Sequence, residues 1–160
     1  RASQRILYEQ YMQAMQTHSA HTQRVLFPEV VQFSPSIAAD LPRILDELKL
    51  LGFDVTDLGG NSYTVTGIPS GLGGLDAVQL VTDLVTTAAE CGNTVTEEIY
   101  TVLATSLAKK AATPYGEILS KEAMSSLVDK LFRCKTSRYT SDGKRVYDII
   151  TDEEISNRLK

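Results

Sequence analysis

Apolar side chains recur every three or four residues in several parts of the chain, which is the spacing of an amphipathic helix. The first such stretch covers 2–17, and its apolar face is broad enough to predict packing on more than one side. A second helix is predicted over 41–51. Asp40 suits its N-cap, Pro42 suits its first turn and Gly52 suits its end.

The same period predicts four more helices, each with a start or stop signal beside it. Gly92 ends a helix over 78–88, and the capping-box pair Thr94 and Glu97 begins a helix that ends near Ala112. Ser120 caps a helix that carries Leu127 and Leu131. The pair Thr151 and Glu154 begins the last helix.

Other stretches have the composition and alternation of strands. The segment 25–33 is β-rich, and its Pro28 suits an edge strand or a strand start. Residues 53–68 alternate apolar and polar side chains around Gly59-Gly60-Asn61, which predicts a β-hairpin. The residues 145–150, "RVYDII", predict a strand after the turn "TSDG". Helices and strands do not alternate strictly, so the predicted class is α+β.

One short segment, Thr22–Pro28 or "TQRVLFP", has two interpretations. It follows a polar run and places three large apolar residues directly before a proline. It could be a strand that enters the core, or a peptide displayed for a partner, and the residues alone leave both open.

The length and the charge distribution of the chain bear on its division into subdomains. The 160 residues suffice for one domain or two small subdomains, and no apolar run approaches the roughly 20 residues of a membrane helix. The net charge of −4 is uneven: +2 over 1–24, −9 over 25–104, +5 over 105–145 and −2 over 146–160. Such asymmetry suggests two subdomains with different partners, although an acidic block could equally serve solubility.

The first residue and the cysteines indicate the size of the protein and its cellular setting. The chain starts at Arg1 inside a predicted helix, so we expect it to be part of a longer protein. The only two cysteines, Cys91 and Cys134, lie far apart, which favours a reduced, intracellular setting.

Few residues suggest chemistry by themselves. His18 and His21 have a spacing that a metal site can use, but no further ligand lies near them in the sequence, so a solvated helix end is favoured. The run "GLGG" at 71–74 lacks the lysine of a phosphate loop and is predicted to be a connector. Six basic residues could contact phosphates or form a solvated face: Lys109, Lys110, Lys130, Arg133, Lys135 and Arg138.

Several segments, in order, resemble the C-terminal dimerisation domain of the MutL family of DNA mismatch repair proteins. They are "RASQRILYEQYM" at 1–12, "LFPEVVQFSPS" at 26–36, "LGFDVTDLGGNSYTVTGIPS" at 51–70 and "YTSDGKRVYDI" at 139–149. The resemblance implies a dimerisation subdomain from 1–24 and 98–160, completed by upstream strands, and an inserted regulatory subdomain over 25–97. It also implies a homodimer, and an upstream domain that uses ATP and Mg²⁺.

The resemblance gives "TQRVLFP" a role. Gln23, Leu26 and Pro28 fit the Gln-x-x-Leu/Ile-x-Pro pattern that docks weakly on the processivity sliding clamp in this family. A Gln side chain can hydrogen-bond at the rim of a pocket while Leu and Pro fill apolar hollows. The alternative is that Val25 and Leu26 face the core and Gln23 is an ordinary surface residue.

The resemblance also implies that this domain does not cut DNA. Many family members nick DNA with metal ions held by His, Glu and Cys side chains. Here Gln4 takes the first Glu position, Glu9 the second, Thr105 or Ser106 that of a helix Cys, and the last motif reads Thr140 to Arg145 with Asp142 as its only carboxylate. Gln and Thr are poor ligands for a transition metal, so no catalytic residue, metal or cofactor is expected here.

The implied function is therefore homodimerisation and partner docking in DNA mismatch repair, in the cytoplasm with the nucleoid, together with DNA and a mismatch-recognition protein. Two alternatives remain. One is a metal-dependent nicking endonuclease with atypical ligands, which the missing Cys and His residues disfavour. The other is a general DNA-binding module, which the net charge of −4 disfavours.

Overall fold

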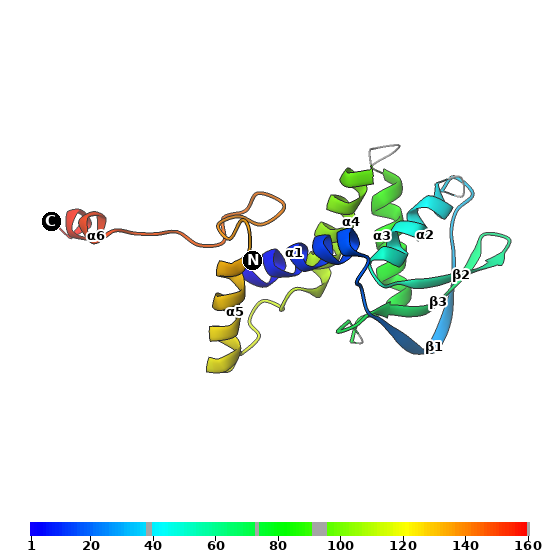
Figure 1. The fold of residues 1–160 in the computed structure, drawn as a ribbon, viewed down its shortest axis with the longest axis horizontal. Helices are drawn as coiled ribbons and strands as arrows, with labels where there is room; N and C mark the ends of the chain where they lie inside the picture. Colours follow the sequence, from blue (N-terminus) through cyan, green and yellow to red (C-terminus); the bar gives the residue numbers. More distant parts are fainter. Residues whose placement is uncertain (38–39, 73, 91–95, 160) are drawn as a thin grey trace.

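The computed structural model describes residues 1–37, 40–72, 74–90 and 96–159. In chain order its elements are α1 (Ala2–Thr17), β1 (Thr22–Gln32), α2 (Leu41–Leu50), β2 (Asp54–Gly59), β3 (Ser62–Pro69), α3 (Ala77–Glu90), α4 (Thr96–Ala111), α5 (Lys121–Arg133) and α6 (Asp152–Arg158). The three strands form one antiparallel sheet in the order β1-β3-β2 (Figure 1). The predicted α+β class is confirmed.

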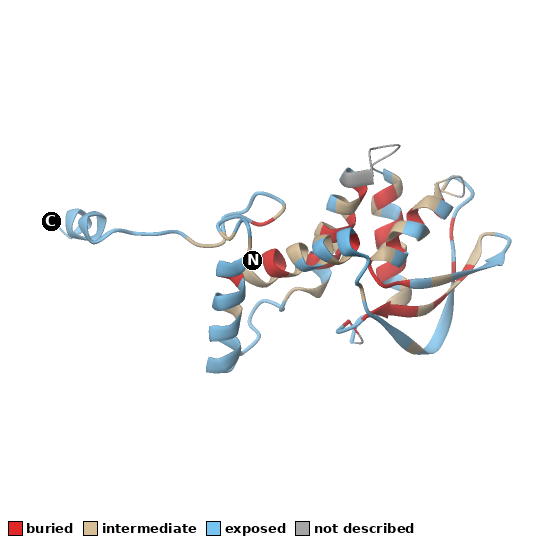
Figure 2. Ribbon diagram, in the orientation of Figure 1, coloured by how far each residue is buried: buried red, intermediate tan, exposed pale blue. Residues whose placement is uncertain are grey.

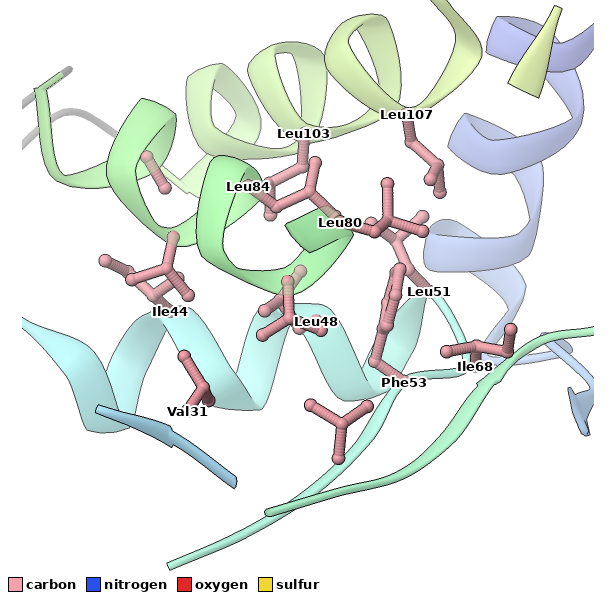
Figure 3. Packing of buried hydrophobic residues seen from close by; sticks show 14 of the residues in the cluster. Val31, Ile44, Leu48, Leu51, Phe53, Ile68, Leu80, Leu84, Leu103 and Leu107 are labelled. Carbon is pink, nitrogen blue, oxygen red and sulfur yellow. The ribbon is translucent and has the colours of Figure 1, made fainter. Parts of the chain in front are cut away.

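The hydrophobic core of the described residues lies between the sheet and the helices. Leucines of α2, α3 and α4 meet Val31, Phe53 and Ile68 from the sheet side (Figure 3). Leu48, Leu84 and Leu103 have no exposed surface. Burying each such side chain stabilises the fold by about 1.5–3 kcal/mol. Figure 2 shows that the buried residues concentrate in this part of the molecule and become sparse toward the C-terminus.

The long first helix links the core to the C-terminal elements. It contacts α4, α5 and α2, as its broad apolar face predicts, and Met15 near its end is fully buried in the core. The core is continuous across the predicted division at residue 98, because Leu103 and Leu107 of α4 belong to the same cluster as the α3 leucines. The two-subdomain division stays a prediction.

Most local signals act as predicted. Asp40 is the N-cap of α2, although its side chain makes no capping hydrogen bond. Gly59, Gly60 and Asn61 all have positive φ and form the hairpin turn. Ser120 caps α5 through the amide of Ala123. The predicted capping box of Thr151 and Glu154 is present at the start of α6. The predicted signals at Gly92 and Thr94 lie outside the described residues, so the capping box of Thr94 and Glu97 stays a prediction.

The predicted strand over 145–150 is wrong. Tyr139 and Arg145 form one isolated antiparallel bridge, and the chain then runs without helix or strand to α6. A strand needs a neighbouring strand to satisfy its backbone groups, and no strand lies beside this segment in the part of the chain that the structure describes. Ile149 and Ile150 are consequently exposed, and Figure 1 shows this segment leading away from the other elements.

Candidate functional site

The segment predicted to dock on a partner forms an irregularity in the edge strand β1. Arg24 pairs with Gly67 of β3, and Glu29 pairs with Val65, so residues 25–28 of β1 stand opposite Thr66 alone. Pro28 has no backbone N–H to give to a ladder, which suits this position. The surplus residues must leave the plane of the sheet, and they form a bulge.

This bulge displays its apolar side chains. Leu26 is 89% exposed and Phe27 is 80% exposed, while Val25 is half-buried against the core. Gln23 and Pro28 are exposed as well. The segment therefore belongs to a strand, and Leu26 points to solvent rather than into the core. Its docking on a partner stays a prediction.

A groove of about 370 Å³ runs beside the bulge. One wall is the segment 23–27, and the other is the start of α3 with the preceding Leu75 and Asp76. Val65 and Ile68 of β3 also line it. The groove and the exposed side chains make one continuous surface at the edge of the sheet.

A second cluster gathers around the carboxylate of Asp142. Its Oδ1 accepts hydrogen bonds from Thr140 Oγ1 at 2.6 Å and from Gln4 Nε2 of α1 at 3.2 Å. Its Oδ2 lies 3.3 Å from Lys109 Nζ of α4 and 3.2 Å from Lys144 Nζ. Three of the positions that the resemblance associates with metal ligands, Gln4, Thr140 and Asp142, are thus brought together.

The charge of Asp142 is already balanced within this cluster. The hydrogen bond from Thr140 and the ammonium groups of Lys144 and Lys109 hold the pKa of its carboxyl far below the usual range. An ammonium group therefore lies where a cation bound to Asp142 would have to approach.

Glu9, the other carboxylate of the predicted set, serves a different contact. It accepts hydrogen bonds from Arg5 Nε at 3.0 Å and from the backbone amides of Lys135 at 2.8 Å and Thr136 at 3.2 Å. Burial alone would raise the pKa of Glu9, but these donors lower it below its usual value. Glu9 thus joins α1 to the chain just after α5. Burial raises the pKa of the nearby Cys134 thiol, and the charge of Glu9 adds to the effect.

The remaining candidates are dispersed. His18 ends α1 in the left-handed conformation, with φ 51°. No group of three or more His, Cys, Asp or Glu side chains that could hold a metal ion occurs among the described residues. Of the six basic candidates, three have a carboxylate partner: Lys109 pairs with Asp142, Lys110 with Asp83 and Arg138 with Asp148. Lys130 and Arg133 lie on α5 in a groove that Glu122 and Asp129 also line. The sixth, Lys135, is exposed just after α5.

Comparison with known proteins decides the family. The model of the MutL C terminal dimerisation domain matches residues 1–119. The chain belongs to this family. It is 48% identical, over its whole length, to the DNA mismatch repair protein MutL of Bacteroides fragilis (strain YCH46), and it covers 26% of that protein. The MutL proteins of Parabacteroides distasonis and Phocaeicola vulgatus are 44% and 42% identical over the same 160 residues, with the same coverage.

The chain thus spans about a quarter of the length of these curated relatives. Within the described residues, no helix has the length and apolar character needed to cross a membrane.

Two features of the site were missed by sequence reasoning. Phe27 is displayed beside Leu26. The signal was available, since three consecutive apolar residues in a strand of period two must place at least one side chain outward. The pairing of Lys109 and Lys144 with Asp142 had no signal, because the three residues come together only when α4 and the turn after α5 are placed.

Proposed function

We propose that this domain is the homodimerisation and partner-docking module of a DNA mismatch repair protein, and that residues 23–28 dock on the processivity sliding clamp. The observation that carries the docking proposal is the bulge in β1. It exposes Leu26 and Phe27 in the free domain and leaves residues 25–28 out of the pairing with β3. The names of the relatives support the repair context.

Docking through this bulge would not require the fold to open. The apolar surface of Leu26 and Pro28 that a partner would cover, about 100 Å², corresponds to about 2.5 kcal/mol. Few ladder hydrogen bonds are lost, because the segment is already outside the register of the sheet. By itself this gain corresponds to a dissociation constant of only about 15 mM, and ordering and association cost part of it. A dissociation constant between about 1 μM and 1 mM, which we expect for docking, therefore also requires the hydrogen bond of Gln23 and the exposed apolar surface of Phe27.

A titration of the purified clamp into the full-length protein tests this proposal. Gln23→Ala should weaken binding without changing the melting temperature, since an exposed Gln contributes little to the core. Leu26→Ala should do the same, because the side chain is 89% exposed. Leu58→Ala is the matched control: Leu58 is 56% exposed on β2, at the other edge of the sheet. Equal clamp affinity for the wild type and Gln23→Ala would reject the docking role.

The domain itself is proposed not to nick DNA. Two lysines and two neutral donors satisfy Asp142, and Glu9 is held by Arg5 and two amides, so neither carboxylate presents free lone pairs to a common ion. The experiment is a nicking assay on supercoiled DNA with Mn²⁺. Nicking that survives purification and is lost in Asp142→Asn would overturn this part of the proposal.

The other partners follow from the repair context. We propose that an upstream domain supplies ATP and Mg²⁺ binding, and that the full-length protein works with DNA and a mismatch-recognition protein in the cytoplasm. DNA contact by the basic residues remains a secondary proposal. Lys130 and Arg133 of α5 and Lys135 just after it are its best candidates, because Lys109, Lys110 and Arg138 each have a carboxylate partner.

A further inference from the structure

The turn that follows α5 is closed by its own backbone. Thr140 donates its amide to the carbonyl of Lys144 at 2.9 Å, and Gly143 donates to the carbonyl of Thr140 at 3.1 Å. The amide of Val146 reaches the carbonyl of Arg138 at 2.8 Å. Residues 138–146 therefore form a small unit, which we call the Asp142 turn. These hydrogen bonds close the turn locally, but they do not place it against the rest of the fold.

The placement depends on contacts from parts of the chain that are distant in sequence. Gln4 of α1 and Lys109 of α4 both reach Asp142, and Arg1 Nη1 donates to the carbonyl of Arg145 at 2.9 Å. Gln4 and Thr140 are buried, and the Asp142 side chain is only 19% exposed. The carboxylate is thus the point where helix α1, helix α4 and the turn meet.

The Asp142 turn also sets where the C-terminal segment begins and in which direction it leaves. Residues 148–159 leave it and carry four exposed apolar side chains: Ile149, Ile150, Ile155 and Leu159. Phe132 and Met124 of α5 are also exposed. Surfaces of this kind in a dimerisation domain are suited to contact a partner.

We infer that Asp142 is a positioning residue: its carboxylate holds the turn against α1 and α4, and it thereby fixes where the apolar C-terminal segment is presented for assembly. The assembly role rests on the proposed homodimerisation. The holding role rests only on the contacts of Asp142.

Negative charge is essential to this role. The two ammonium groups approach one carboxylate oxygen, and the two neutral donors approach the other. In Asp142→Asn, the amide must turn its NH₂ group toward either two ammonium groups or two hydrogen-bond donors. Asp142→Glu keeps the charge and both acceptor oxygens. The pair of variants therefore separates charge from the mere presence of a polar side chain.

Hydrogen exchange of the backbone amides in 140–146, measured in the full-length protein, tests the inference. In Asp142→Asn, the backbone amides of 140–146 should exchange at least about tenfold faster than in the wild type, while the exchange rates of the α2 and α3 amides should not change. In Asp142→Glu, the rates at 140–146 should stay closer to those of the wild type. Asp129→Asn, an exposed carboxylate on α5, is the matched control and should exchange as the wild type does. Raising the ionic strength should speed exchange in the wild type and have little effect in Asp142→Asn.

A dilution series by light scattering gives the second readout. The dimer dissociation constant should rise at least severalfold in Asp142→Asn and not in Asp129→Asn. Wild-type exchange rates at 140–146 in Asp142→Asn would overturn the inference, whatever the oligomeric state. Faster exchange with an unchanged dissociation constant would remove the assembly role. A wild type that never dimerises would reject the proposed function and leave the exchange result to decide the holding role by itself.

Discussion

Replacing Glu9 by Ala should destabilise the domain strongly, because Glu9 ties α1 to the chain after α5. The substitution removes the acceptor of the Lys135 and Thr136 amides and leaves the buried Arg5 without its carboxylate. Hydrogen bonds to a charged group contribute about 1.5–3 kcal/mol each, and water can replace part of that here, because Glu9 is 21% exposed. We expect a total loss of about 2–4 kcal/mol, which lowers the melting temperature by about 5–15 °C in a domain of this size.

The loss of stability caused by Glu9→Ala should shrink as the pH falls. The pKa of Glu9 is lower in the folded domain than the usual value of about 4.3 in an unfolded chain. Its stabilising contribution is therefore complete above about pH 4.3 and is lost as the pH falls through the lower, folded pKa. The difference between wild type and Glu9→Ala should be constant near neutral pH and shrink at acid pH.

Urea unfolding at pH 7 and at pH 3 is the assay for both statements. Glu98→Ala, an exposed carboxylate on α4, is the control and should change stability by less than about 0.5 kcal/mol. A Glu9→Ala variant as stable as the Glu98→Ala variant would refute the tie between α1 and the chain after α5. Any nicking assay that uses Glu9→Ala must run below the melting temperature of that variant, since unfolding would mimic the loss of a ligand.

Two other substitutions test the backbone. His18→Gly should raise the free energy of unfolding by about 1 kcal/mol, because His18 is exposed and has φ 51° at the end of α1, where glycine carries no steric penalty. Thermal melts measure this, and an unchanged or lower melting temperature would contradict it. Gly67→Ala should cost about 1–3 kcal/mol in urea unfolding, because the new Cβ would collide with Thr22 Cγ2 and stand 2.9 Å from Asp54 Cβ. A wild-type midpoint would show that the strands flanking β3 can move apart freely.

The helices and the hairpin were predictable because their signals are local. The three-to-four-residue period of α1, the glycines and Asn61 of the hairpin turn, and the Thr151 capping box act over a few residues. The strand predicted over 145–150 failed for the opposite reason. Its alternating side chains satisfy a strand pattern, but a strand forms only beside a partner, and sequence pattern does not supply one.

In the candidate site, too, the local features were predictable and the features that depend on distant residues were not. The exposure of Gln23 and Pro28 agrees with the pattern read along the chain, while the bulge that displays Leu26 and Phe27 depends on the register between β1 and β3. Gln4, Lys109 and Asp142 are separated by more than thirty residues at each step, and only the packing of α1 and α4 brings them together. Long-range electrostatic clusters of this kind cannot be derived from local periodicity.

Homodimerisation of this domain is tested most directly by a measurement of molar mass. Light scattering on the full-length protein at tens of micromolar, a concentration chosen to suit interfaces of ordinary affinity, should give the mass of two chains, and dilution should return the mass of one. The exposed apolar side chains of α5 and of the C-terminal segment are the reason to expect this result. A mass of one chain throughout the concentration range would contradict the account.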